Sequence, residues 1–155
     1  MPTQAEQLIE EVRPLVLADV PALAGEGKWL VGPTAPDRRV APPRVAWVEG
    51  DADFSGQNLN PGKTVQRQRA IWTRQREITA YVAGESPAQA EAIVDVLLQR
   101  LHEKYSVACR PVRETVEPRA AADKARLGDF RVLTLVVDLA VLDKPDTRAL
   151  IETVD

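Results

Sequence analysis

The segment from Phe130 to Val141 constrains the fold more than any other part of the chain. Leucine and valine occupy every second position from 133 to 141, while Thr134 and Asp138 fall between them. This period of two is typical of a strand that buries one face. Because one strand cannot bury its own apolar face, the pattern predicts a sheet covered on one side by other elements.

Other segments supply the neighbouring strands. Ile78, Ala80 and Val82 alternate with more polar residues at the end of a long predicted strand, 65–82, which Gly84 terminates. Shorter apolar runs are bounded by glycine and proline, as strands commonly are. These shorter strands are predicted at residues 28–31 and 44–49, and residues 149–154 allow a short last one.

The N-terminal segment has the pattern of a helix. Thr3 and Glu6 have the spacing of a capping box, in which each side chain accepts a hydrogen bond from the other residue's backbone N–H. Apolar residues then recur at helical spacing, at positions 8, 9, 12, 15 and 16. Pro14 is expected to kink or stop this helix, because its ring clashes with the carbonyl four residues earlier.

A second helix is predicted from Ser86 to about His102. Ser86 caps it, Pro87 stands at the first helical position, and Gln89 completes a second capping box. Apolar residues form one stripe along it. The order of elements predicts an α+β fold, a single domain over residues 1–155 in which two helices cover an antiparallel sheet of about four strands.

Three stretches lack a regular pattern. Prolines crowd residues 32–43, glycines and turn-forming residues fill 50–64, and the third stretch covers 110–128. Long irregular connections in compact domains tend to be functional or mobile. We therefore expect three mobile loops at these places.

Composition removes several classes of protein. The chain has 155 residues, no apolar run near the roughly 18 that span a bilayer, and no opening pattern of a secretory signal. A single cysteine excludes an internal disulfide and a multi-cysteine metal site, and a single histidine excludes a histidine pair. A net charge of −3 argues against a protein that coats nucleic acid. We expect a soluble domain with no membrane partner.

Catalytic, metal and cofactor sites are not expected, because no cluster of reactive residues is visible. Cys109 lies near two arginines, but a nucleophile also needs a base, and His102 stands in the last turn of a helix, where it complements the dipole. No serine has the setting of a hydrolase nucleophile. Residues 25–28 lack the spacing of a phosphate loop. Asp51 and Asp53 lack the further oxygen ligands of a calcium loop.

The most distinctive local feature is a basic, glutamine-rich segment. From Arg38 to Arg76 there are eight basic and three acidic residues, a local charge of +5 in a chain of −3. Such a strand can bind carboxylates of a neighbouring subunit, bind phosphates with a tryptophan stacked on a base, or stay solvated. We rank subunit contact above nucleic acid because the overall charge is negative. The residues concerned are Arg67, Arg69, Trp72, Arg74 and Arg76.

Two segments and the order of the elements together form a layout that resembles a known family. The segments are Pro42–Val48 with the glycine- and aspartate-rich stretch after it, and Arg74–Gly84 followed by a capped helix. The layout resembles the tail terminator (tail completion) proteins of long-tailed bacteriophages and phage-like particles. The resemblance extends from the first helix to the strand at Phe130. It implies a structural protein of the virion tail or neck, made in the cytoplasm of the host bacterium.

The resemblance also implies partners. Such proteins form a ring, typically of six copies, that caps the tail tube protein, stops tube polymerisation and docks the head connector or neck protein. Genomic DNA passes through the lumen without specific binding, since an acidic lining offers phosphates no cations. The basic strand 67–76 then makes a subunit or tube contact. The loop after residue 50 orders on a partner, with Asp51, Asp53, Phe54, Asn58 and Lys63 as its binding residues.

Two alternatives stay open. One is another neck or head–tail joining protein, which differs only in the partner that each face binds. The other belongs to a different class, a small nucleic-acid-binding domain that uses the strand 67–76. Its affinity for DNA would fall steeply with salt.

Overall fold

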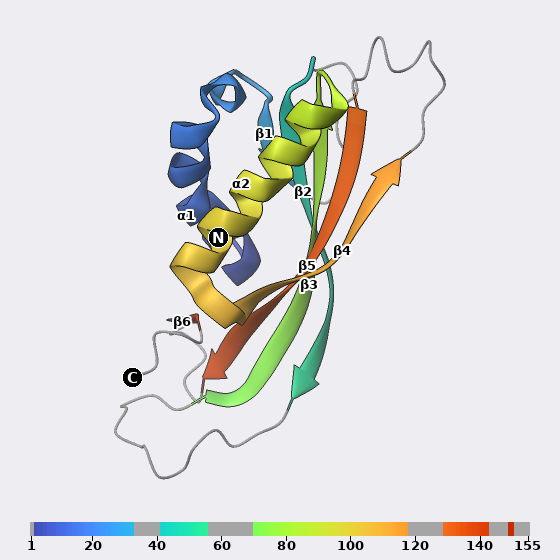
Figure 1. The fold of residues 1–155 in the computed structure, drawn as a ribbon. Coiled ribbons are helices and arrows are strands. Elements are labelled where there is room, and N and C mark those ends of the chain that lie inside the picture. The colour runs from blue at the N-terminus through green and yellow to red at the C-terminus, as the bar shows by residue number, and fades with distance from the viewer. Residues whose placement is uncertain (1, 33–40, 56–69, 118–128, 143–148, 151–155) are drawn as a thin grey trace.

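The computed structural model describes residues 2–32, 41–55, 70–117, 129–142 and 149–150, and it shows one sheet with two helices on one face (Figure 1). The predicted α+β class is confirmed. Two short 3₁₀ turns, η1 (Pro21–Ala24) and η3 (Ser106–Ala108), follow the helices. The regular elements are α1 (Gln4–Asp19), β1 (Trp29–Val31), β2 (Arg44–Ser55), β3 (Ala70–Gly84), α2 (Pro87–Tyr105), β4 (Cys109–Glu117), β5 (Asp129–Leu142) and β6 (Ala149–Leu150).

The strands that the structure describes form one mixed sheet in the order β1-β2-β3-β5-β4, with β6 also paired to β5. The long neighbours β2, β3 and β5 are antiparallel, as predicted. Two details differ from the predicted antiparallel sheet of about four strands: β1 runs parallel to β2, and the described strands form a six-stranded sheet. A parallel pair needs a return connection of about a dozen residues, and the chain between these two strands, 32–43, is long enough for one.

The core lies between the sheet and the two helices. The β5 residues Leu133, Leu135, Val137 and Leu139 are all buried, which confirms the face predicted from their spacing. In β1 and β2, at the opposite edge of the sheet from β4, the buried rings of Trp29 and Trp47 lie with their centroids 5.7 Å apart. The apolar stripes of α1 and α2 close this core from the opposite side.

The sequence indicated that Pro14 would kink or stop the first helix. Helix α1 does not stop at Pro14. It continues to Asp19, and Val12 and Val16 on either side of the proline are fully buried. Burying a valine side chain is worth about 1.5 kcal/mol or more, whereas an interior proline costs about 3 kcal/mol. Packing of the helix face therefore offsets the lost backbone hydrogen bond.

The predicted helix caps are present. The side chain of Thr3 accepts from the backbone N–H of Glu6, and the capping box is complete. At α2 the Ser86 side chain accepts from the N–H of Gln89. The Gln89 side chain accepts from the N–H of Glu85 instead of that of Ser86, so the second box closes one residue earlier than predicted.

Two of the predicted loops contain strand. β2 continues to Ser55, and a bulge between Glu49 and Ala52 accommodates the turn-forming residues that suggested a loop. β4 occupies 109–117, at the start of the predicted loop 110–128. Pro111 argues against a central strand, but β4 is an edge strand, where a missing N–H is tolerated. In the first predicted loop, the described residues 32 and 41–43 belong to no helix or strand. Residues 33–40, 56–64 and 118–128 of the three predicted loops lie outside the described residues, as do 65–69 and 151–154 of the predicted strands.

Candidate functional site

One end of the sheet extends past the helices. Figure 1 shows β2, β3 and β5 continuing beyond the ends of α1 and α2. We call residues 52–55 of β2 together with 72–76 of β3 the distal ribbon. Its two strands are paired in register, with Phe54 opposite Arg74 and Ala52 opposite Arg76. This end of the sheet holds the described residues of the basic strand 67–76, namely Trp72, Arg74 and Arg76.

The two faces of the distal ribbon differ in chemistry. Because side chains alternate along a strand, Trp72 and Arg74 lie on the same face as the buried Ile78 of β3. Phe54 joins them there, since it stands opposite Arg74. The other face carries Asp53 and Gln75, which are paired across the strands. The predicted sharing of one face by Trp72, Arg74 and Arg76 is therefore confirmed.

The aromatic residues of this face are exposed. Trp72 keeps 47% and Phe54 keeps 57% of their surface accessible. The guanidinium of Arg74 lies over the Phe54 ring, 5.4 Å from its centroid, in a cation–π contact. The Arg74 Nε is buried and has no hydrogen-bond partner among the residues that the structure describes. Aromatic and arginine side chains are enriched in protein–protein interfaces, and tryptophan and arginine are frequent among the residues that contribute most of the binding energy.

Arg76 has a role inside the chain. Its Nε lies 3.1 Å from the Glu49 carboxylate, and its Nη1 donates to the Gly50 carbonyl at 2.9 Å. Glu49 in turn accepts a 2.8 Å hydrogen bond from the Thr3 hydroxyl. Arg76 thus links the β2 bulge to the start of α1. Among the described residues of the basic strand 67–76, this leaves Trp72 and Arg74 to face a partner.

The predicted partner-binding residues are divided by the structure. Asp51, Asp53 and Phe54 lie in β2, on a strand instead of the predicted loop. Asn58, Lys63, Arg67 and Arg69 lie outside the described residues.

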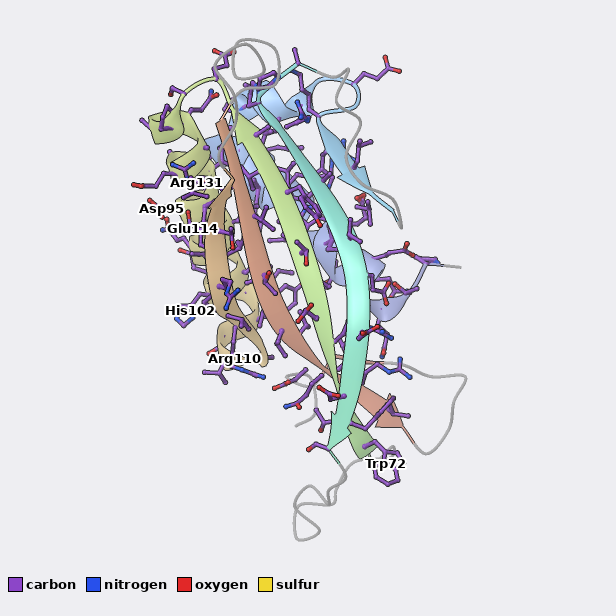
Figure 2. All side chains as sticks on the ribbon, turned by 90° about the vertical axis from the view of Figure 1, so that its right-hand side faces the viewer. Trp72, Asp95, His102, Arg110, Glu114 and Arg131 are labelled. Carbon is purple, nitrogen blue, oxygen red and sulfur yellow. The ribbon has the colours of Figure 1, made fainter. Side chains whose placement is uncertain are left out.

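The reactive residues are placed as the sequence indicated. Cys109 is buried, and this burial raises the pKa of its thiol to about 12, so the thiolate that a nucleophile needs is strongly disfavoured. His102 is exposed near the end of α2 (Figure 2). Among the residues described, no three histidine, cysteine or acidic side chains cluster as metal ligands do. No described helix has the length and apolar character needed to cross a membrane.

Sequence reasoning missed a second exposed apolar surface, the β4 edge, which we define as Asp95 of α2 with Val112, Glu114 and Val116 of β4. The two valines keep 60% and 59% of their surface accessible. Glu114 and Val116 stand opposite Leu133 and Arg131 of β5, on the side of the sheet that α2 covers. Val112 lies at the bulge between Pro111 and Arg113, where the pairing with β5 shifts register. The β-branched residues of 110–117 favour a strand and could have predicted β4. Pro111 argued against a strand there.

No family model matches the chain, and no curated protein matches it.

Proposed function

We propose that this protein is a tail terminator, a structural virion protein that forms a ring on the end of a phage-type tail. The ring caps the tail tube, stops its polymerisation and offers the surface on which the head connector docks. It acts through shape and surface contacts, without a catalytic group or a cofactor. Its partners are further copies of itself, the tail tube protein and the connector or neck protein, while the genome passes through the lumen without specific binding.

The distal ribbon is the observation that carries the proposal. The distal ribbon projects beyond the helical layer with β5 paired along its β3 strand, and it exposes a tryptophan and a phenylalanine on a single face. Exposed aromatic groups grouped in this way mark a surface that binds another macromolecule. The hydrogen-bonded register of β2 and β3 fixes the ribbon in shape, as a docking surface requires.

The arrangement of elements also supports the proposal. Two helices on one face of a mainly antiparallel sheet is the fold that the resemblance to tail terminators implies. The buried, protonated Cys109 thiol offers no competing chemistry. Each subunit of a ring needs two contact surfaces, and the exposed β4 edge is a second surface besides the distal ribbon.

Solution mass, measured by light scattering with negative-stain images of the same peak, is the first test. A closed ring, or a monomer that becomes a ring on purified tail tubes, supports the proposal. In a tail-assembly reaction, withholding the protein should give tails of uncontrolled length, and adding it back should restore one length.

The open alternatives give different results. A ring that joins heads to finished tails but leaves tail length unchanged is the behaviour of a head–tail joining protein. A monomer that ignores tubes and binds DNA with an affinity that falls steeply with salt is a nucleic-acid-binding domain. Either outcome would overturn the terminator proposal.

A further inference from the structure

The distal ribbon and the β4 edge lie at separate places on the molecule. Figure 2 shows Trp72 at the far end of the sheet, whereas Asp95 and Glu114 lie along the side where α2 runs beside β4. The ribbon belongs to β2 and β3, while β4 is the edge strand beyond β5. The two surfaces of one chain are therefore too far apart to cover each other, and each is open to another molecule.

The two surfaces are complementary in chemistry. The ribbon presents two aromatic rings and the guanidinium of Arg74, which pairs with no carboxylate among the residues described. The β4 edge presents two exposed valines and two carboxylates. Apolar groups on each side can exclude water from one contact, and a planar guanidinium binds carboxylates with two parallel hydrogen bonds.

The two carboxylates of the β4 edge can still bind a cationic side chain of another molecule. Asp95 is exposed on α2. Glu114 approaches Arg131, but the closest distance between nitrogen and oxygen is 3.7 Å, longer than a hydrogen bond, and the Glu114 side chain remains 39% exposed. Both groups are therefore available to an arginine of another molecule.

We propose that the distal ribbon of one copy binds the β4 edge of the next, with Arg74 directed at Asp95 and Glu114, and with Trp72 and Phe54 against Val116. The partner is a second copy of this chain, and the inference rests on the proposed function, which requires a ring. A contact between two different surfaces is heterologous, and it produces a closed ring when the rotation between copies closes. An isologous contact would stop at a dimer.

Charge reversal tests the pairing. The Arg74→Glu and Asp95→Arg variants should each raise the protein concentration needed for half assembly by at least about tenfold, since each places like charges together. The double variant should return to within about threefold of the wild type. The matched control is Glu10→Arg, which reverses an exposed carboxylate of α1 outside both surfaces and should leave assembly unchanged. Additive loss in the double variant, with no recovery, would overturn the pairing.

Disulfide cross-linking tests the geometry independently of the charges. A chain with Trp72→Cys and Val116→Cys, in a Cys109→Ala background, should oxidise to a ladder of covalent oligomers. Each single-cysteine chain should stay monomeric on the same gel, because a heterologous contact keeps like positions apart. Efficient dimers of the Trp72→Cys chain alone would show an isologous contact and overturn the inference.

The outcomes separate this inference from the proposed function. A wild-type ring that fails both tests overturns the contact and leaves the terminator proposal standing. If the cysteine pair forms covalent oligomers and the double charge reversal restores assembly, but the protein has no effect on tail length, the contact is supported and the proposed function is overturned. A wild-type chain that stays monomeric alone and on tail tubes overturns both.

Discussion

The close approach of Gly84 to α2 allows a stability change to be worked from the structure. A Cβ added at Gly84 would lie 2.6 Å from the backbone nitrogen of Ala90 and 2.9 Å from its Cα. That nitrogen donates the first helical hydrogen bond of α2, to the Ser86 carbonyl at 3.0 Å. Both atoms are backbone, so no side chain can move aside. The Gly84→Ala chain must shift the start of α2 away from β3.

The expected magnitude follows from the cost of overpacking. Extra methyl groups in a tight site cost roughly 1–3 kcal/mol. For a chain of this length, 1 kcal/mol lowers the Tm by about 2–4 °C, so Gly84→Ala should lower the Tm by about 2–12 °C. Urea unfolding followed by tryptophan fluorescence measures the change, because Trp29 and Trp47 are buried in the core beside the helices.

Gly32 provides the matched control. A Cβ at Gly32 meets nothing within 4 Å, and its backbone is not left-handed. Gly32→Ala should therefore leave stability unchanged or raise it by about 0.4–1 kcal/mol, through the smaller freedom of the unfolded chain. Equal stability of Gly84→Ala and the wild type, within about 0.5 kcal/mol, would refute the steric reasoning.

Three further predictions concern single side chains. The pKa of the Cys109 thiol is raised from 9.0 to about 12, so the free energy of unfolding should fall as the pH rises from 9 towards 12, while this thiol causes no loss below pH 9. Urea unfolding across this pH range should show a smaller fall for Cys109→Ala. Arg100 forms a bidentate pair with Asp19, at 2.7 and 2.9 Å, which lowers the pKa of that carboxyl. Arg100→Gln should therefore reduce the loss of stability seen as pH falls below 3.8, as measured by thermal unfolding at several pH values. Thr3→Ala removes both the α1 cap and the hydrogen bond to Glu49, and should cost about 1–2 kcal/mol in urea unfolding, with Thr3→Ser recovering most of it.

The candidate site shows where sequence reasoning was sufficient. The placement of Trp72, Arg74 and Arg76 on one face needed only the strand period and a strand that contains all three. The partners of these residues could not be found in this way. Arg76 meets Glu49 through the pairing of β2 with β3, and Phe54 meets Arg74 through the same pairing. A glycine- and aspartate-rich stretch predicted a loop, whereas a bulge kept it in β2.

By itself the sequence determined the local elements and their buried faces. Periodicity and capping residues act over a few positions, so Thr3, Ser86 and the leucines of β5 specified their own elements. Only the tertiary structure decided the parallel β1, the edge strand β4 and the passage of α1 through Pro14. Each depends on energy gained from distant residues: β1 on its pairing with β2, β4 on the free edge of β5, and α1 on the core that Val12 and Val16 enter. The separation of the distal ribbon from the β4 edge, which lets one copy bind the next, arises in the same way from the order of strands in the sheet.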